Sequence, residues 1–334
     1  MKNLYPFLIL ILLSFSIKAQ DTFSIIAVDP VTGDIGSAGA SCVTGAPGNW
    51  DVWITDIIPG RGGVNSQAYI CIPNSNLQNA IARMEEGFAP QDIIDWLVLN
   101  DACSSQNYDP EYRQYGIVDL DGNGDPRAAG WTGSSTDDYK EDRQGANYSI
   151  QGNILLDISV IDNMEDNFNN TSGTLADKLM AALQGANFPG ADERCLTAGT
   201  SSRAAYIVVY HEDDEPGEPY LKLVVPTQST GVEPIDILQD MYDDFLAVTE
   251  FDLKNMIDLY PNPVSNELIV SYDVSLDISE MEILDIHGRR VKWINNSSNT
   301  NNQKMVDVSS LQNGLYFINV TSSKGNQSLK FVKE

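Results

Sequence analysis

The segment from residue 21 to residue 42 constrains the fold of this chain more than any other. Residues 23–28 form a short apolar run rich in β-branched residues, closed by turn residues at Asp29-Pro30 and Thr32-Gly33. A run that is apolar on both faces predicts a strand buried between two layers. The next run, Ile35–Ser41, is almost entirely Gly, Ala and Ser, so another backbone or a ligand can approach it closely. The segment therefore predicts a hairpin at the centre of a layered protein.

Thr22 stands at the head of this first strand. If the peptide bond before it is cut, its freed α-amino group can act as the base for its own hydroxyl. A signal peptidase is expected to cut after Ala19 or Gln20, which leaves one or two residues before Thr22. The nitrogen of Thr22 then stays in an amide, which is no base, so a catalytic role requires further trimming. The alternative is that Thr22 is an ordinary β-branched residue at a strand start.

The first twenty residues predict a signal peptide. Lys2 gives a positive start, residues 5–17 form an apolar segment too short to cross a bilayer, and cleavage is expected around Lys18-Ala19-Gln20. No later segment is long and apolar enough to span a membrane. We therefore expect an exported protein without a membrane span.

The charge balance excludes some classes of partner. The 334 residues include 47 Asp and Glu against 20 Lys and Arg, for a formal net charge of −27. Nucleic acids and anionic membranes both require basic surface, so neither is an expected partner. The acidity suits the solvated surface of an extracellular protein, and the length allows two domains.

Four cysteines, Cys42, Cys71, Cys103 and Cys195, follow the signal peptide. An even number in an oxidising compartment predicts two disulfides, for which three pairings exist. We favour Cys42 with Cys71, because both end strands expected to be neighbours, and therefore Cys103 with Cys195. The spacing fits no zinc motif, and two histidines are too few for a His-rich metal site.

The order of expected elements predicts an α+β domain over residues 21–250. Helical spacing of apolar residues occurs in pairs between strand hairpins, which favours two antiparallel sheets sandwiched by helix layers. The expected helices begin near residues 75, 91, 160 and 175, and a last one covers 235–248. After a short linker around 250–255, residues 256–334 show only short strands and turns, which predicts a small, separate, all-β Ig-like sandwich.

The C-terminal region carries a group of short motifs: Leu259-Tyr260-Pro261-Asn262-Pro263, Asp285-Ile286-His287-Gly288-Arg289, Asn313-Gly314-Leu315-Tyr316-Phe317-Ile318 and Lys330-Phe331-Val332-Lys333-Glu334. Together they resemble the C-terminal sorting domain of the type IX secretion system of Bacteroidetes. The resemblance implies that the secretion machinery is a partner. It also implies passage through the periplasm and outer membrane to the cell surface or the medium. An adhesive Ig-like module is the alternative.

The N-terminal region resembles an uncharacterised bacterial family with an Ntn-hydrolase-like fold. The matching runs are Thr22-Phe23-Ser24-Ile25-Ile26-Ala27, Gln67-Ala68, Tyr115-Gly116-Ile117-Val118-Asp119 and, most distinctively, Gln151-Gly152-Asn153-Ile154-Leu155. The resemblance implies a four-layer αββα fold. It also implies descent from hydrolases that cleave amides with an N-terminal Ser, Thr or Cys.

The same resemblance implies a set of site residues. Thr22 is the expected nucleophile, and Asn153 with the backbone amides about Gly152 is expected to hold the oxyanion. The residues expected to line the substrate pocket are Ser41, Ser66, Gln67, Gln151 and Arg203. For Arg203 two roles stay open, a buried ion-pair partner and a clamp for a substrate carboxylate.

A turn in the middle of the chain has the spacing of half a calcium loop. Asp119, Asp121, Asn123 and Asp125 alternate around a glycine, but the twelfth position is Gly130 rather than Glu. A hairpin turn favours the same residue types. No cofactor is therefore expected, with calcium as the alternative.

Three functions are compatible with the sequence. The first is an exported amide hydrolase that uses Thr22 on peptide-like or cell-wall-derived amides. The second is a non-catalytic extracellular protein that binds a small peptide-like or glycan ligand on the same scaffold. The third is a calcium-dependent surface adhesion module.

Overall fold

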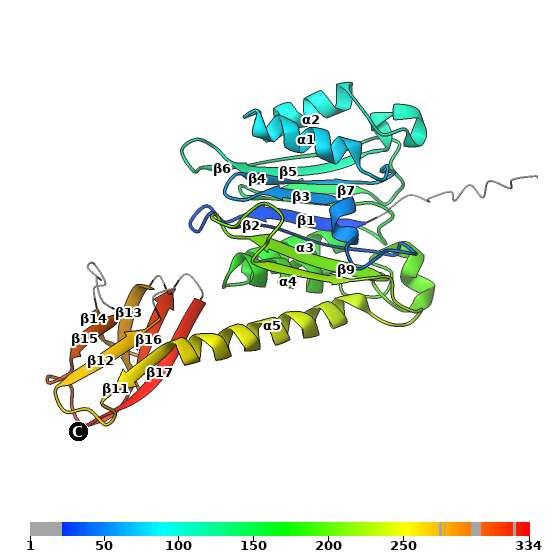
Figure 1. Ribbon diagram of the computed structural model, residues 1–334. Coiled ribbons are helices and arrows are strands. Elements are labelled where there is room, and N and C mark those ends of the chain that lie inside the picture. The colour runs from blue at the N-terminus through cyan, green and yellow to red at the C-terminus, as the bar shows by residue number, and fades with distance from the viewer. Residues whose placement is uncertain (1–21, 274–275, 277, 295–301, 323–324) are drawn as a thin grey trace, which may run out of the picture. The chain divides into compact units, whose positions relative to one another are not determined.

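The computed structural model describes residues 22–273, 276, 278–294, 302–322 and 325–334, and for residues 248–255 it describes the backbone (Figure 1). The predicted signal peptide, residues 1–20, and its cleavage site lie outside the described residues. The chain divides into two compact units, residues 1–239 and 240–334. Each unit is described by itself.

Two antiparallel sheets form the centre of the first unit. The larger has the order β10-β9-β2-β1-β8-β7, and the smaller has the order β3-β4-β5-β6. The strands of the larger sheet are β1 (Phe23–Val28), β2 (Ile35–Ser41), β7 (Glu141–Gln144), β8 (Tyr148–Gly152), β9 (Ala204–Tyr210) and β10 (Leu221–Val225). Those of the smaller are β3 (Thr55–Ile58), β4 (Gly62–Gln67), β5 (Gln114–Leu120) and β6 (Pro126–Thr132). The predicted hairpin is β1–β2, and β1 is central and buried along its whole length.

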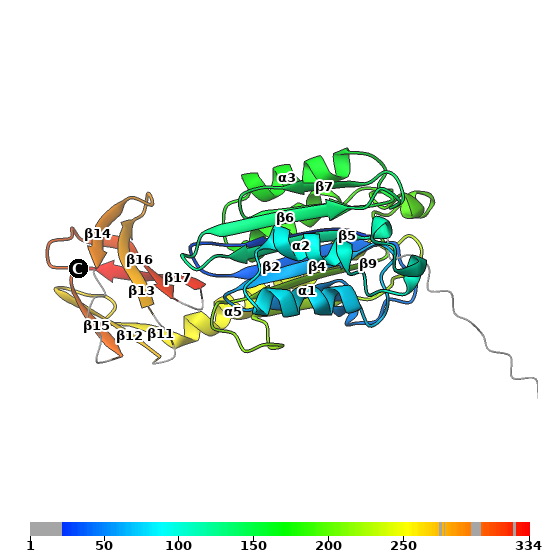
Figure 2. The same cartoon turned by 90° about the horizontal axis from the view of Figure 1, so that it is seen from above.

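Helices cover the outer faces of both sheets. The helices α1 (Ser75–Glu85) and α2 (Pro90–Leu99) pack on the smaller sheet, and α3 (Ser159–Asn170) and α4 (Leu175–Gly185) pack on the larger one. Figures 1 and 2 show the resulting order of layers: helices, sheet, sheet, helices. Two of these helices start at residues with capping side chains. Asn74 accepts a hydrogen bond from the Leu77 amide, and Thr174 forms a capping box with Asp177.

The small residues of β2 have a packing role. A Cβ atom placed on Gly36 would lie 2.6 Å from Cδ1 of Leu179 on α4, so only glycine lets this helix approach the strand so closely. The other side of β2 faces the smaller sheet, where Ser37 contacts Asn65. The strand thus packs closely against the helix layer on one face and against the smaller sheet on the other.

The two predicted disulfides are present, but the predicted pairing is wrong. Cys42 is bonded to Cys195 and Cys71 to Cys103. Cys42 follows β2 in the larger sheet, whereas Cys71 follows β4 in the smaller one, so the two strand ends belong to different layers. Cys195 reaches Cys42 because the neighbouring carboxylate of Asp192 accepts the Cys42 backbone N–H at 2.8 Å.

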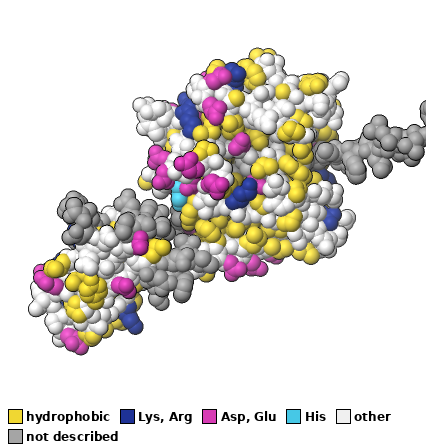
Figure 3. All heavy atoms as spheres, viewed as in Figure 1, with side chains coloured by type: hydrophobic (Ala, Val, Ile, Leu, Met, Phe, Trp, Pro, Cys, Tyr) yellow, Lys and Arg dark blue, Asp and Glu magenta, His cyan; other side chains and the backbone are white. Residues whose placement is uncertain are grey.

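A charged cluster lies at the end of the first unit where β9 finishes. Asp34 Oδ1 and His211 Nδ1 are 2.8 Å apart, and the His211 ring stacks on Tyr220 with centroids 4.0 Å apart. The next four residues, 212–215, are all acidic. Figure 3 shows a histidine side chain bordered by acidic side chains on the face viewed.

The second unit contains an all-β region, as predicted. Three strands, β11 (Ile257–Tyr260), β12 (Glu267–Tyr272) and β15 (Gln303–Asp307), form one sheet. The other sheet has the order β14-β13-β16-β17, with β13 (Ile278–Asp285), β14 (Arg290–Ile294), β16 (Gly314–Ser322) and β17 (Gly325–Lys333). Apolar side chains from both sheets, among them Leu268, Met281, Ile318 and Phe331, form one buried cluster.

The residues predicted to form a linker continue a helix. The helix α5 spans Pro234–Met256, and β11 begins at the next residue. No Gly or Pro occurs between residues 235 and 256, so nothing in the sequence interrupts the helix at 248. Over the described part of the chain, no helix combines the length and the hydropathy needed to cross a membrane.

Candidate functional site

Thr22 lies at one end of the sheet sandwich, where β1 begins. Phe23 pairs with Ala40 of β2 and with Gly152 of β8, so Thr22 sits between the ends of these two strands. The Thr22 backbone N–H donates to Oδ1 of Asn153 at 3.3 Å, and the Thr22 carbonyl accepts from the Asn153 backbone N–H at 3.3 Å. Strand alternation places the Thr22 side chain on the same face as that of Ser24, toward the smaller sheet.

The smaller sheet reaches Thr22 through Gln67, the last residue of β4. Gln67 Nε2 donates to the Thr22 carbonyl at 2.8 Å and to Oε1 of Gln114 at 2.8 Å. Gln67 Oε1 accepts from the Ser24 hydroxyl at 2.7 Å. Gln114 Nε2 in turn donates to the carbonyl of Gly152 at 2.8 Å. The head of β1 is therefore held by amide side chains from the facing sheet.

A layer of polar side chains continues from Thr22 into the space between the sheets. Gln151 Nε2 and Asn65 Nδ2 both donate to the Ser24 hydroxyl, at 2.6 and 3.0 Å. Asn65 Oδ1 accepts from Ser37, whose hydroxyl is also 2.9 Å from that of Tyr206. All five side chains are fully buried, and burial raises the pKa of the Tyr206 hydroxyl, so the layer is uncharged.

One position of this layer needs glycine. A Cβ on Gly116 would lie 2.0 Å from Oε1 of Gln151, which is closer than any side chain permits. Gly116 on β5 therefore lets Gln151 of β8 extend across the space between the sheets. This contact links two of the sequence runs that carry the family resemblance, 115–119 and 151–155.

Strained backbone gathers at the Thr22 end. Ala68 and Tyr69, which follow Gln67, have φ of 58° and 43°, and Ile154, which follows Asn153, has φ of 52°. Non-glycine residues rarely adopt this left-handed conformation, and such residues cluster at functional sites. The strain lies one or two residues from each of the two side chains that hold the Thr22 backbone.

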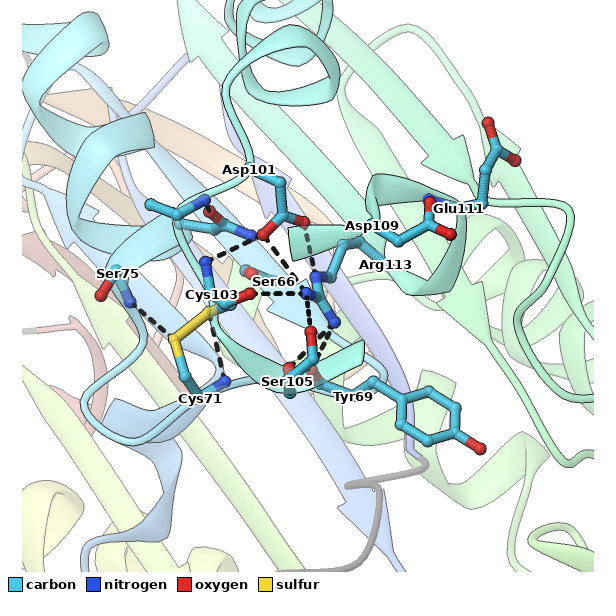
Figure 4. A network of polar contacts seen from close by, with 12 residues as sticks. Ser66, Tyr69, Cys71, Ser75, Asp101, Cys103, Ser105, Asp109, Glu111 and Arg113 are labelled. Carbon is cyan, nitrogen blue, oxygen red and sulfur yellow. Dashed lines mark hydrogen bonds and ion pairs between the residues drawn. A yellow bond between two sulfur atoms is a disulfide. The ribbon is translucent and has the colours of Figure 1, made fainter. Parts of the chain in front are cut away.

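A buried arginine fixes the strained segment (Figure 4). Arg113 forms a bidentate ion pair with Asp101, at 2.7 and 3.2 Å, and both side chains are 1% exposed. Its other N–H groups donate to the carbonyls of Tyr69, Cys103 and Ser105. The Cys71–Cys103 disulfide lies beside this network, so the loops after β4 and before β5 form one rigid unit.

The structure brings together only some of the predicted site residues. Thr22, Asn153, Gln67, Gln151 and Gly152 meet at one end of the sandwich. The backbone of Ser41 lies at the same end, because Ala40 pairs with Phe23. The side chain of Ser66 lies on the opposite face of β4, where its hydroxyl contacts Asn74 at the start of α1. Ser66 is therefore part of the helix layer rather than of the Thr22 surroundings.

A cavity of about 310 Å³ opens at this end of the sandwich. It is lined by the Cys42–Cys195 disulfide, by Arg194 and Arg203, and by the hydroxyl-bearing residues Thr44, Thr197 and Thr230. Thr22 is not among the residues that line this cavity, and it is only 1% exposed. Of the residues predicted to bind substrate, Arg203 lines this cavity.

The calcium-type turn holds its side chains by internal contacts. Asp119 is fully buried and forms a bidentate pair with Arg127, at 2.8 and 2.6 Å. Asp121 accepts the backbone N–H groups of Asn123 and Asp125 at 2.7 and 3.0 Å. Within the described residues, no group of three or more His, Cys, Asp or Glu side chains has the arrangement of a metal site. Calcium binding at this turn stays a prediction.

Sequence reasoning missed the two arginines that shape this end of the molecule. Arg113 precedes a predicted strand in a segment rich in acidic residues, and such an isolated cation is a signal for a buried ion pair. Arg194 follows Asp192 and adjoins Cys195, and that proximity to a cysteine was the available signal. Neither signal indicates which loops the arginine joins.

Comparisons with known proteins agree with both resemblances. A family model described as a family of unknown function, DUF1028, matches residues 22–235, and its match begins at Thr22 itself. A model of a secretion system C-terminal sorting domain matches residues 258–334. The crystal structure of protein SPO2555 from Silicibacter pomeroyi, described as DUF1028, is similar in fold. It is 27% identical with a TM-score of 0.52, covering 67% of this chain and 88% of that chain. No curated protein matches the chain.

Proposed function

We propose that the first unit of this chain, which belongs to the DUF1028 family, is an amide hydrolase. The sorting domain at residues 258–334 directs the protein to the cell surface or outside. Thr22 is the proposed nucleophile and, once it is the first residue of the mature chain, also supplies the base. Peptide-like or cell-wall-derived amides are the proposed substrates. The reaction needs no cofactor, because one residue provides both reacting groups.

The observation that carries this proposal is the setting of the Thr22 nitrogen. Thr22 precedes the central strand β1, and its backbone N–H donates a hydrogen bond to Oδ1 of Asn153. The carbonyl of Thr22 accepts hydrogen bonds from the Gln67 side chain and the Asn153 backbone N–H. A free amine at this position keeps Oδ1 of Asn153 as its hydrogen-bond acceptor, which fixes the orientation of the amine. The layer order of helices, sheets and helices is also the order expected of an Ntn-hydrolase-like sandwich, and this agreement supports the assignment.

The proposed reaction has two steps. The Thr22 hydroxyl attacks the amide carbonyl carbon, its proton passes to the α-amine, and the carbonyl oxygen becomes an oxyanion. The Asn153 amide and the backbone near Gly152 are the proposed donors to that oxyanion. The C–N bond then breaks as the amine returns the proton to the leaving nitrogen. Water, activated by the same amine, hydrolyses the ester and frees Thr22.

The burial of Thr22 sets a condition on this mechanism. The described chain exposes only 1% of the residue, and its nitrogen is bonded to Asp21. Removal of residues 1–21 is therefore required to free the amine, and substrate binding must also open an approach to the hydroxyl. A free α-amine has an ordinary pKa of about 8, so the rate is expected to rise with pH through that region.

The first experiment is the intact mass of the protein secreted by a type IX-competent host, and a chain that begins at Thr22 is expected. The second is the hydrolysis of a panel of N-acyl p-nitroanilides. Thr22→Ala should lower the rate by at least about 10³-fold, as loss of a nucleophile does elsewhere, and Thr22→Ser should keep much of it. The control Thr32→Ala removes an exposed threonine in the turn after β1 and should leave the rate unchanged.

A second candidate is a non-catalytic protein that binds a small peptide-like or glycan ligand on the same scaffold. The observation in its favour is that the cavity at this end is lined by Arg203 and not by Thr22. A mature chain that begins at Gln20 or Asp21 supports this candidate and contradicts the hydrolase.

A further inference from the structure

The cavity at the Thr22 end carries an uncompensated positive charge. Arg194 lies on its wall, but the buried carboxylate of Asp192 pairs with it at 2.6 Å and neutralises it. Arg203 differs, because its Nε and Nη2 atoms donate to one backbone carbonyl, that of Gln228, at 3.0 and 2.7 Å. Within the part of the chain that the structure describes, no carboxylate lies within ion-pair distance of Arg203. Glu233 is bound by the backbone N–H and the hydroxyl of Ser201.

This charge stands in a strongly acidic chain. The chain has a formal charge of −27, and both the buried Arg113 and the exposed Arg194 have acidic partners. An arginine bound only to a carbonyl keeps its full charge and has the Nη1 edge left for another group. Three threonine hydroxyls, from Thr44, Thr197 and Thr230, line the same cavity and add hydrogen-bonding groups.

We propose that this cavity binds the terminal carboxylate of a short peptide-like ligand, with Arg203 as the residue that recognises it. Arginine is the side chain best suited to a carboxylate, because its planar N–H groups match the two oxygens. The proposal rests on the proposed function for the peptide-like class of the ligand, and of the two roles that the sequence leaves open for Arg203 it adopts the clamp for a carboxylate.

The sheet register places Arg203 relative to Thr22. Ser41 ends β2 beside Thr22, and Ala204 of β9 pairs with Ser41, so the backbone of Arg203 lies two strands from that of Thr22. Ala204 shares the face of Ser41 and Thr22, so strand alternation puts Arg203 on the other face of the sheet. The carboxylate site is therefore separate from the surroundings of the Thr22 hydroxyl. A cavity of about 310 Å³ is at the lower limit for a small-molecule site and suits a ligand of dipeptide size.

The test compares two probes that differ only in charge. N-acetyl-Ala-Ala with a free carboxylate and the same compound as its carboxamide are titrated into the full chain carrying Thr22→Ala, by calorimetry at low salt. Binding of the acid at least tenfold tighter than the amide is expected, with the difference reduced at high salt. Equal binding of the two probes, or binding of neither, overturns the proposal.

Variants assign the preference to one residue. Arg203→Gln should remove the preference for the acid, and Arg203→Lys should keep part of it, because the charge remains while the planar donors are lost. Arg289→Gln, which removes one exposed charge from the sorting domain, should keep the full preference. A preference that survives in Arg203→Gln overturns the assignment. If that variant does not fold, the ratio of the affinities for the acid and the amide in the parent chain still tests whether the cavity prefers a carboxylate.

The result is separable from the hydrolase proposal, because binding is measured in a chain that lacks the nucleophile. An acid preference without any hydrolysis by the Thr22 chain leaves the carboxylate site standing and removes the catalytic role of Thr22. Hydrolysis of the p-nitroanilide panel without an acid preference supports the catalytic role of Thr22 and removes the carboxylate site.

Discussion

At the scale of single residues, Gln67 joins three parts of the molecule. Its amide contacts the carbonyl of Thr22 on β1, the hydroxyl of Ser24 on the same strand, and the side chain of Gln114 on β5. It is fully buried, so water cannot replace any of these bonds. A buried amide that satisfies several partners is costly to remove, because each partner keeps an unpaired polar atom.

We therefore expect Gln67→Ala to lower the free energy of unfolding by on the order of 3 kcal/mol. Urea unfolding followed by circular dichroism measures this loss. The control Gln91→Ala changes an exposed glutamine of α2 whose side chain donates a hydrogen bond to Asp95, and it should cost less than about 0.5 kcal/mol. Equal losses in the two variants would mean that the polar layer contributes nothing special to stability.

At the scale of secondary-structure elements, the two ends of the β1–β2 hairpin have different chemistry. At the Thr22 end, the side chains from the facing sheet that hold β1 are uncharged amides. The other end joins Asp34, where β2 begins, to His211, where β9 finishes. The hydrogen bond to Asp34 raises the pKa of His211 above its ordinary value of 6.5, and the charges of Asp214 and Asp213 raise it further against the opposing effect of burial.

This shift predicts a pH dependence of stability. A histidine whose pKa is higher in the folded than in the unfolded state stabilises the fold fully below the unfolded value of 6.5. That contribution is lost as the pH rises from 6.5 through the folded value. Thermal melting of the parent chain and of His211→Gln, between pH 5 and 9 in about 0.5-unit steps, measures it. The melting temperature of the parent should fall across that window relative to the variant.

The control for this series is His287→Gln, which removes the other histidine, 69% exposed in the sorting domain. Its melting curve should follow that of the parent at every pH. A parent chain whose difference from His211→Gln stays constant with pH would rule out the ion pair as the cause.

At the scale of the whole molecule, separate regions serve export and the proposed chemistry. The sorting-domain model matches residues 258–334, and the buried core of this region consists of side chains from residues 257–331. The residues around Thr22 all come from the first unit. The two functions therefore depend on different residues.

Deletion of residues 258–334 should stop passage across the outer membrane and leave the first unit folded in the periplasm. Fractionation of the host with an antibody against the first unit measures the location. The melting temperature of the purified unit, with both of its disulfides, measures its folding. A deletion of the 302–322 segment alone serves as a comparison, because it removes β15 and β16 and should also stop export. Secretion of either shortened chain would contradict the role of the tail.

The sequence alone was enough for the local and periodic features. The apolar run of β1, the small residues of β2 and the paired helices are visible as patterns, because each depends on neighbours within a few residues. The sorting tail was identified in the same way, from short motifs at fixed places along the chain. The predicted pocket was less complete, because Ser66 and Gln67 are adjacent in sequence but point to opposite faces of β4.

Only the tertiary structure decided how distant segments meet. It paired Cys42 with Cys195 because β2 lies in one sheet and β4 in the other, a fact that no local pattern contains. It also placed Arg203 on an open cavity and Thr22 in a buried setting, although both stand at the ends of nearby strands. Composition and periodicity determine which segments form strands and helices, whereas the partner of each strand and the exposure of each end depend on long-range packing.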